Sequence, residues 1–427
     1  MLVHEKALSF DFPHSVEQPL GRMVETLVGS EILRIAGEVR ALKAAGQVVC
    51  DLTVGDFSPK EFHIPQALRE GIVRALAAGQ TNYPPSDGVP ELRRAVQRLY
   101  EEVLGLSYPL ESVIIAGGAR PAIYSFFRAV LDPGDVVVFP VPSWNNNHYA
   151  HLCGASAVAV ETRPENGFLP TVEELRPHLR GARLLSLNSP LNPAGSGFKA
   201  DALREIARMV VDENARRGSS ERPLYLLYDH IYWYLASESS PHSTPVGLVP
   251  EVAPFTLFVD GISKGLAATG LRVGWGIAAP QVMGRFKDLL GHVGAWAPRP
   301  EQVATAELLS DPSRLEALTR DVREGLNARL DALYRGLMQL RSEGLPIEAL
   351  PPAGALYLSA RFDLVEKLGS NRAIRQLLLE KAGFAVVHFG AFGLTTDTGW
   401  FRLSVGAVSV AEIEAAIGRV REALVGL

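Results

Sequence analysis

The feature that most constrains the fold is an alternation of short apolar runs with longer helical or loop segments between residues 112 and 279. The runs are "SVIIA", "DVVVFP", "SAVAVE", "RLLSLN", "LYLLYD", "TLFVDG" and "VGWGIAA". Most are continuously apolar instead of alternating apolar with polar residues, which is typical of strands buried on both faces of a sheet. We therefore expect an α/β fold in which a mainly parallel sheet is sandwiched by helices.

The chain is also expected to form two structural units, because 427 residues are too many for one ordinary core. After about residue 300 the pattern changes to long amphipathic helices followed by a few alternating strands. Near the other end, "SEILRIAGEVRALKAAG" predicts a helix capped by Ser30. We predict a large domain over residues 55–300. The N-terminal segment 1–54 would join residues 301–427 in a smaller α+β domain.

Two further helices carry local signals. Residues 90–104 start at a proline suited to a first helical turn and place five apolar side chains on one face: Leu92, Ala95, Val96, Leu99 and Val103. The last helix opens with "SVAE", in which Ser409 and Glu412 form a capping box.

Composition excludes several classes of function. The formal net charge of −5 gives no electrostatic reason to expect a nucleic acid or an anionic membrane surface as partner. No run of 18 apolar residues is present, and the first residues lack the pattern of a signal peptide, so a cytoplasmic protein is expected. Cys50 and Cys153 match no metal-binding spacing, and no metal is expected.

The candidate functional residues follow the apolar runs, because ligands of an open parallel sheet bind at the carboxyl ends of its strands. They comprise the turn "GGARPAI", then Trp144, Asn192, Asp229 with Tyr232, and Lys264 with Arg272. Each alone has an ordinary structural explanation, such as a tight turn, a core aromatic, a helix cap or a surface lysine. Together they describe a pocket for a phosphorylated, aromatic, nitrogen-containing aldehyde. Lys264 would form a Schiff base with it, and Arg272 would bind its phosphate.

From about residue 50 to the C-terminus the chain resembles the class I/II aminotransferases, in the aspartate-aminotransferase superfamily of fold-type I pyridoxal-5′-phosphate-dependent enzymes. The most diagnostic element is "SKGLAATGLRVG", which matches the signature SK-x5-G-x-R-x-G. The resemblance also covers "VGD", "NYPPSDGVPELRRAV", "GGARPAI", "PSW", "SPLNPAG", "DHIY" and "FRLSVG". It implies the fold of that superfamily, pyridoxal 5′-phosphate as cofactor, and a homodimer with shared active sites.

The resemblance implies a role for each matching residue. At the cofactor phosphate these are the backbone N–H groups of Ala119 and Arg120 and the side chain of Arg272, with Tyr83 reaching the cofactor of the partner subunit. At the ring, Trp144 would stack on its face, Asp229 would contact its nitrogen, and Asn192 and Tyr232 would contact its hydroxyl. Lys264 would be the covalent anchor and the proton carrier. For the substrate they are Arg402 at the α-carboxylate, with Gly55 and Asn192 beside it.

Two positions depart from the pattern of the superfamily. Gly261 stands where a serine often adds a hydroxyl to the phosphate, so we expect Ser263 or the neighbours of Ala119 to compensate. Phe389 replaces a proline in "VHFGAFG", which we expect to affect the small domain and not the chemistry.

The resemblance implies an aminotransferase that moves an amino group between an L-amino acid and a 2-oxo acid by a ping-pong mechanism. A lyase or decarboxylase with the same cofactor is the alternative, and a ligand-sensing transcriptional regulator is a remote one. Residues 291–302 lie where members of the superfamily often place side-chain recognition, so His292, Trp296 and Arg299 are candidates, with surface or packing residues as the alternative for each. Residues 1–25 carry no interpretable pattern beyond the possibility that they drape over a partner subunit.

Overall fold

The fold is built on a seven-stranded sheet, seen in the computed structural model, which describes residue 9 and residues 20–427. Its strands are β2 (Val113–Ala116), β3 (Val136–Val141), β4 (Ser156–Glu161), β5 (Ala182–Asn188), β6 (Tyr225–Asp229), β7 (Thr256–Gly261) and β8 (Gly274–Ile277). They lie in the order β2-β8-β7-β6-β5-β3-β4. Neighbouring strands are parallel except that β8 runs antiparallel to both β7 and β2. Each strand falls on one of the seven apolar runs, so the predicted mainly parallel sheet is confirmed.

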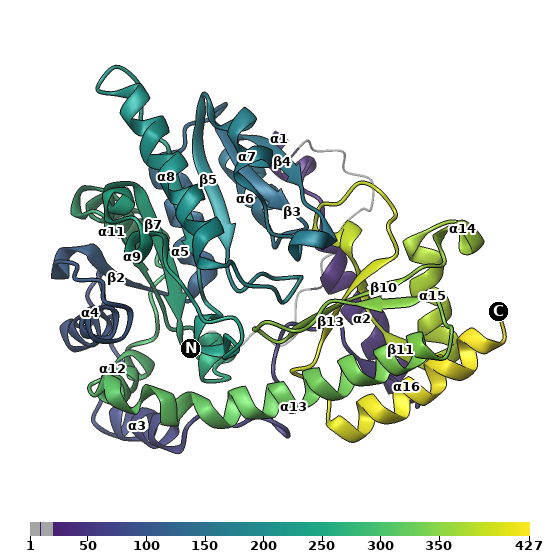
Figure 1. Cartoon of the computed structure of the whole chain (residues 1–427). Helices are drawn as coiled ribbons and strands as arrows, with labels where there is room; N and C mark the ends of the chain where they lie inside the picture. Colours follow the sequence, from purple (N-terminus) through teal and green to yellow (C-terminus); the bar gives the residue numbers. More distant parts are fainter. Residues whose placement is uncertain (1–8, 10–19) are drawn as a thin grey trace.

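Helices flank this sheet (Figure 1). One group comprises α5 (Ala119–Val130), α6 (Asn146–Cys153) and α11 (Pro280–Val293), and the other α7 (Val172–Leu179), α8 (Ala200–Arg217) and α9 (Pro245–Leu248). Beyond the β2 end, α3 (Gln66–Ala77), α4 (Pro90–Leu104) and α12 (Arg299–Leu308) pack on one another. Helical cover on both faces explains why the strands are apolar throughout.

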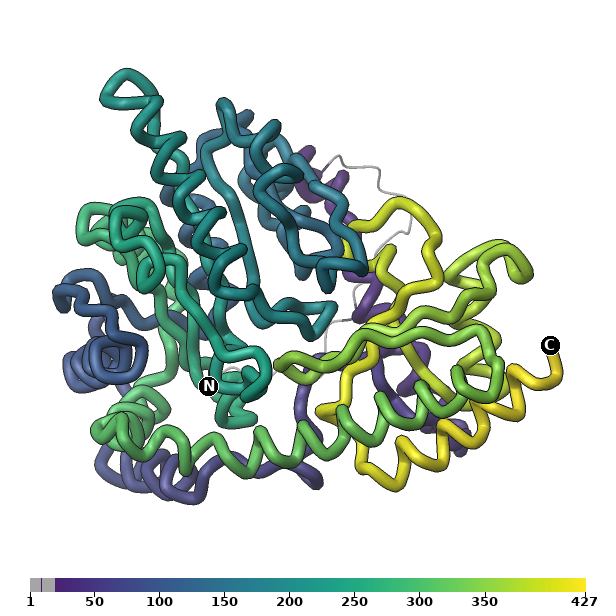
Figure 2. Tube along the Cα trace, viewed as in Figure 1, coloured from purple at the N-terminus to yellow at the C-terminus, as the bar shows by residue number. Residues whose placement is uncertain are grey.

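The C-terminal third forms an antiparallel sheet in the order β12-β13-β10-β9. Its strands are β9 (Ile347–Ala349), β10 (Tyr357–Phe362), β12 (Val387–His388) and β13 (Trp400–Ser404), and its helices are α13 (Leu315–Ser342), α14 (Val365–Leu368), α15 (Asn371–Ala382) and α16 (Val410–Val425). The long helix α13 runs beneath both parts of the molecule (Figures 1 and 2).

The segment that precedes the large sheet pairs with this C-terminal third through its strand and also contacts the large unit, where Nε2 of His151 lies 2.8 Å from the Met23 carbonyl oxygen. It contains α1 (Arg22–Glu25), α2 (Glu31–Ala44) and β1 (Cys50–Asp51). β1 pairs in parallel with β11 (Phe384–Ala385), and Cys50 lies opposite Phe384. The predicted α+β unit made from both ends of the chain is therefore confirmed as part of the fold.

Two main hydrophobic cores follow this arrangement. One includes the seven-stranded sheet and continues through α12 to Leu315, and the other lies between α13, α16 and the antiparallel sheet. Phe389 packs in the first core, with its ring centroid 4.9 Å from that of Phe168, and not with the small unit alone as expected. The boundaries after residues 54 and 300 remain predictions.

The local helix signals are confirmed with one exception. The hydroxyl of Ser30 accepts from the Leu33 N–H, and Ser409 and Glu412 form the capping box. In α4, Val103 was expected on the buried face but is 42% exposed. Tyr100 is fully buried at that end of the helix, because its hydroxyl lies 2.7 Å from Nε2 of His230 in the core.

No helix in the described part of the chain combines the length and the apolar character that a membrane span requires.

Candidate active site

A cavity of about 470 Å³ lies where the strands of the large sheet end. It is lined by ten of the eleven sequence-predicted site residues: Gly55, Ala119, Arg120, Trp144, Asn192, Asp229, Tyr232, Lys264, Arg272 and Arg402. They come from loops after β2, β3, β5, β6 and β7, from β13, and from the segment after β1. The sheet therefore brings together residues that lie up to 347 positions apart in sequence, between Gly55 and Arg402.

Arg272 reaches the cavity through the antiparallel course of β8. β8 runs antiparallel to β7, and its first residue, Gly274, pairs with Gly261 at the end of β7, so the beginning of β8, and not its end, faces the cavity. Arg272, two residues earlier, has a φ of +57°, and its Nη1 donates to the Thr269 carbonyl at 2.8 Å. The short helix α10 (Ile262–Gly265) follows the neighbouring strand β7 and carries Lys264.

Three glycines allow these elements to approach closely. A Cβ on Gly261 would lie 2.7 Å from the Val273 carbonyl oxygen and 2.8 Å from Cα of Gly274. A Cβ on Gly274 would lie 2.6 Å from the carbonyl carbon of Gly118. Gly118 has a φ of +100°, and a Cβ there would overlap the Arg272 guanidinium.

This packing explains why Gly261 replaces the serine that the superfamily often has. Any side chain at that position would collide with backbone atoms of β8, so no hydroxyl can be supplied from there. The hydroxyl-bearing residues Ser263 and Thr269 line the same cavity instead. Ser263 was predicted to compensate and remains a candidate, while Thr269 was missed because it lies among the variable positions of the signature.

The first turn of α5 and Arg272 form a corner of the cavity that is suited to an anion. α5 begins at Ala119 directly after Gly118, so its unpaired N–H groups face the same cavity as the Arg272 guanidinium. A helix N-terminus favours negative charge through these N–H groups and through the helix dipole.

The amine of Lys264 lies at the wall of the cavity. Nζ donates to the Gly55 carbonyl at 2.7 Å. Burial lowers the pKa of Lys264 to about 8; the Asp56 carboxylate raises it, whereas Arg120, Arg402 and Arg272 lower it. A substantial neutral fraction near neutral pH is what a nucleophilic amine requires.

Asp229, at the end of β6, is the acidic group of the cavity floor. Burial raises the pKa of Asp229 to about 7, while the Ile231 N–H and the charge of Lys264 lower it. The Asn188 side chain donates to the Asp229 carbonyl at 2.8 Å and so fixes its backbone. Because few neighbouring groups stabilise its charged form, this carboxyl group is suited to pair with a cationic group of a bound ligand.

A hydrogen-bonded chain joins Arg402 to Tyr232. Nη1 of Arg402 donates to Oδ1 of Asn192 at 3.1 Å, and Nδ2 of Asn192 donates to the Tyr232 hydroxyl at 3.4 Å. Tyr232 also lies 2.8 Å from the hydroxyl of Tyr357, on β10. Tyr357 was missed in the sequence, because a tyrosine within the apolar run "GALYLSA" cannot be distinguished from a core residue.

Arg402 is almost fully enclosed, at 1% exposure. Its Nη2 donates to the Thr53 carbonyl at 2.5 Å, and its guanidinium carbon lies 4.8 Å from the ring centroid of Tyr357. Its Nε has no hydrogen-bond partner within the described residues. A buried donor without a partner is costly, which indicates a site for an acceptor from outside the chain.

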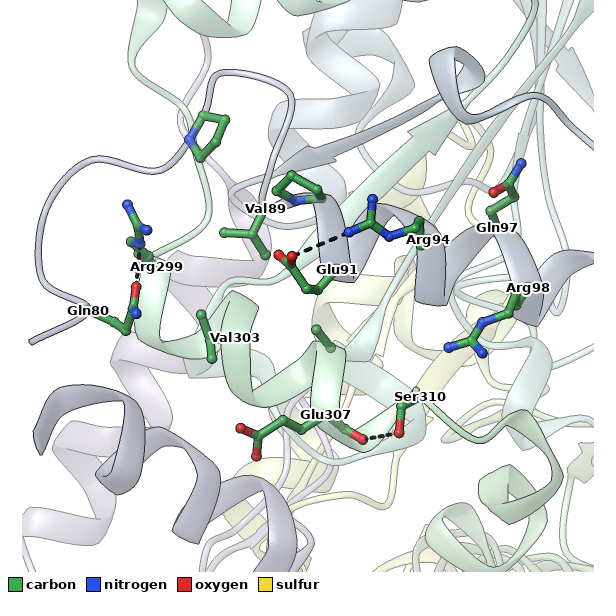
Figure 3. Close-up of a pocket in the computed structure, with 13 residues that line it drawn as sticks. Gln80, Val89, Glu91, Arg94, Gln97, Arg98, Arg299, Val303, Glu307 and Ser310 are labelled. Atoms are coloured by element: carbon green, nitrogen blue, oxygen red, sulfur yellow. Dashed lines mark hydrogen bonds and ion pairs between the residues drawn. The ribbon is translucent and has the colours of Figure 1, made fainter. Parts of the chain in front are cut away.

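Tyr83 is the one predicted site residue that the structure does not bring into this cavity. Its side chain is 82% exposed, and its ring packs edge-on against Trp296 with centroids 5.5 Å apart. Arg299 donates to the Tyr83 carbonyl at 3.3 Å and to Gln80 at 2.7 Å. The pair of Arg299 and Gln80 lies at the edge of a separate hollow of about 970 Å³ between α4 and α12 (Figure 3).

Within residue 9 and residues 20–427, no cluster of three histidine, cysteine or acidic side chains is arranged to hold a metal ion.

A family model for "Aminotransferase class I and II" matches residues 47–420. The chain belongs to this family. It is thus an aminotransferase, an enzyme of class EC 2.6.1 that transfers amino groups.

Named relatives and solved structures agree with this assignment. The aspartate/prephenate aminotransferase of Thermus thermophilus is 32% identical over 379 residues, which cover 88% of this chain and 92% of the relative. The aspartate aminotransferase of Rhizobium meliloti (strain 1021) is 29% identical over 416 residues, which cover 95% and 96%. The structure of the aspartate aminotransferase from Thermus thermophilus with maleate has a TM-score of 0.85 at 30% identity and covers 95% of this chain and 100% of that one.

The packing around Gly261 predicts the effect of restoring the missing serine in this aminotransferase. Gly261→Ser should lower the free energy of unfolding by roughly 1–3 kcal/mol, because the new Cβ overlaps backbone atoms that cannot rotate away. Gly270→Ser in the same loop is the control, since no atom lies within 4 Å of its Cβ position. Denaturant unfolding of both variants measures the difference. Equal stability of Gly261→Ser and the unmodified protein would contradict the packing argument.

The environment of Lys264 predicts when its amine becomes reactive. In cofactor-free protein, acetylation of Lys264 by acetic anhydride should reach half its maximal rate near pH 8, compared with about 10.4 for a lysine side chain in a model peptide. Peptide mass spectrometry over a pH series gives the rate. Asp56→Asn should move the midpoint to lower pH, because it removes the carboxylate that stabilises the charged amine. A midpoint near pH 10 in the unmodified protein would contradict this account.

Proposed function

We propose that this aminotransferase holds pyridoxal 5′-phosphate on Lys264 and moves an amino group between an L-amino acid and a 2-oxo acid. The observation that carries the proposal is one cavity containing a lysine amine of lowered pKa, a carboxyl group, an indole and an arginine beside a helix N-terminus. These groups match the aldehyde, the ring nitrogen, the ring face and the phosphate of that cofactor. When bound, the cofactor supplies an aldehyde that condenses with amines and a ring that withdraws electrons from the substrate Cα.

Each residue that would hold the cofactor matches one of its chemical groups. Arg272 and the N–H groups at the start of α5 would bind the phosphate, and Trp144 would cover one ring face. The Asp229 carboxylate would keep a proton on the ring nitrogen, because an adjacent negative charge favours the cationic ring. Asn192 has its Oδ1 engaged by Arg402, which leaves Nδ2 to donate toward Tyr232 and the ring hydroxyl.

The substrate groups are assigned to the remaining side chains. The Arg402 guanidinium binds the α-carboxylate, and its unpartnered Nε supports this role. Arginine suits the task because its planar fork can donate two parallel hydrogen bonds. The amine of Lys264, which donates to the Gly55 carbonyl in this structure, would accept a proton from the substrate Cα and return it later in the cycle. The same backbone segment at Gly55 borders the bound carboxylate.

We further propose aspartate as amino donor and a homodimer with shared sites. The relatives named above are aspartate aminotransferases, which supports an acidic donor.

The exposed position of Tyr83, away from the cavity of its own chain, supports a role across an interface. A single-chain mass in sedimentation equilibrium at assay concentration would contradict the dimer. The cytoplasmic location remains a prediction.

A coupled assay tests the function. Purified protein with pyridoxal phosphate, L-aspartate and 2-oxoglutarate should form oxaloacetate over many turnovers, and Lys264→Ala should reduce the rate by at least about a thousandfold. Without 2-oxoglutarate, product formation should stop after one equivalent per site. Continued release of ammonia or CO₂ without an acceptor would contradict amino transfer and indicate a lyase or a decarboxylase.

A further inference from the structure

A buried carboxyl group that has no task in the proposed reaction lies directly behind the site. Asp260 is the last residue but one of β7, four positions before Lys264, and is 0% exposed. It does not line the cavity. Its carboxyl group accepts from the backbone N–H of Gly261 at 2.7 Å and from Nε1 of Trp233 at 2.9 Å. Burying such a group is costly, so its presence calls for an explanation.

The hydrogen bond to Trp233 joins the two segments that carry the reacting side chains. Trp233 directly follows Tyr232 and opens the short helix η3 (Trp233–Leu235) after β6. Asp260 lies at the end of β7, which leads into α10 and Lys264. Nζ of Lys264 lies 5.8 Å from the ring centroid of Tyr232. A shift of one segment against the other therefore changes the distance between the amine and the phenol.

A close contact between η3 and α10 lies beside this bond. A Cβ on Gly265, in α10, would lie 2.8 Å from ring atoms of Tyr234, in η3. The ring of Tyr234 in turn lies against that of Trp233, with centroids 3.9 Å apart. The indole N–H is the only polar group of the Trp233 side chain, so its bond to Asp260 sets the orientation of the ring.

The surroundings of Asp260 favour its uncharged form. The titratable groups that face it are Asp229 from β6, Tyr100 from α4 and Tyr234 from η3, and no cation pairs with it within residue 9 and residues 20–427. Burial raises the pKa of Asp260 well above its ordinary value; three hydrogen-bond donors lower it, and the charge of Asp229 raises it. Two neighbouring carboxyl groups in a core cannot both be charged at low cost.

Tyr100 can accept the proton that an uncharged Asp260 carries. Its hydroxyl faces Asp260 and also lies 2.7 Å from Nε2 of His230. Nδ1 of His230 lies 3.2 Å from Nε2 of His242, and burial lowers the pKa of both histidines, so both rings are neutral. The arrangement in which Tyr100 donates to His230, and His230 donates to His242, leaves the Tyr100 oxygen free to accept.

We propose that Asp260, as an uncharged carboxylic acid, is a positioning residue that ties Trp233 to the segment carrying Lys264. Through the adjoining backbone, this bond sets the position of Tyr232 relative to the amine. The uncharged form also leaves Asp229 as the single negative charge at this end of β6 and β7, where the ring nitrogen of the cofactor would lie. The inference rests on the proposed function, because it assumes that Tyr232 and Lys264 act in amino transfer.

The first test breaks the bond from either side in cofactor-loaded protein. Trp233→Phe removes the donor and Asp260→Leu removes the acceptor. Each should lower kcat for amino transfer about tenfold and change KM for the amino donor less than about threefold, because a misplaced reacting group costs rate while other contacts hold Arg402. In the Trp233→Phe protein, Asp260→Leu should change kcat less than about twofold further, because both substitutions remove the same interaction.

Two further variants serve as controls. Asp260→Asn keeps an oxygen that can accept from the indole and should retain at least about a third of kcat. Tyr108→Phe removes a buried hydroxyl that has no hydrogen-bond partner among the described residues, and its ring packs on the same strand through Phe258. It should leave kcat unchanged.

The second test needs neither cofactor nor activity. The folding equilibrium constant of the full-length protein, from denaturant unfolding over a pH series, is compared with that of Asp260→Asn. The folded protein would keep a proton on Asp260 that the unfolded chain releases above about pH 4. The constant of the unmodified protein, relative to that of the variant, should therefore fall about tenfold for each pH unit above about pH 5, for as long as the folded protein keeps that proton.

Several results would overturn the inference alone. Unchanged kcat in Trp233→Phe, with or without a loss of stability, would make the bond purely structural, whatever Asp260→Leu does. A raised KM at constant kcat would place the effect in substrate binding. A folding ratio that does not change with pH would mean that Asp260 is charged. Absence of amino transfer in the unmodified protein is distinct from these results, because it would overturn the proposed function and this inference with it.

Discussion

The close contact between the end of β7, the start of β8 and the start of α5 is the constraint on which the site depends. Gly261, Gly274 and Gly118 meet there, and each excludes a side chain because a Cβ would overlap neighbouring atoms. The contact is possible because β8 is antiparallel and begins at the edge where the parallel strands end. It sets Arg272 against the N-terminal turn of α5 and fixes the loop that carries Lys264. A purely parallel sheet would place the start of β8 at the opposite edge.

Burial then determines the chemistry of the groups that this contact positions. Removing Lys264 and Asp229 from water penalises their charged forms, so the pKa of the amine falls to about 8 and the pKa of the carboxyl rises to about 7. The amine can therefore lose its proton close to physiological pH, which suits the proton transfer proposed for Lys264. The three arginines that share the cavity lower the pKa of the amine further while they attract anionic ligands.

The architecture and most of the site were predictable from local sequence signals. Continuous apolar runs identify buried strands, and polar residues such as Asp229 and Lys264 directly after them must meet at one edge of a parallel sheet. The limits of the buried face of a helix were less certain: Tyr100, four residues after Val96, is buried in α4 with its hydroxyl 2.7 Å from Nε2 of His230, whereas Val103 is 42% exposed.

Residues that act through tertiary contacts were not predictable. Tyr357 resembles a core residue in its own segment, and only the fold brings its hydroxyl to Tyr232 from another part of the molecule. The reason for Gly261 also requires the fold, because its collision partners belong to the next strand. The Arg120 side chain forms no hydrogen bond or ion pair with the described residues, and the sequence alone could not have predicted this.

The central claim is that the lysine delivered by β7 is the covalent anchor of the cofactor. Its most direct test is to load the purified protein with pyridoxal phosphate, reduce it with borohydride, and map the modified lysine by peptide mass spectrometry. The account predicts one phosphopyridoxyl group per chain, on Lys264. A label on another lysine, or no stable label, would contradict it.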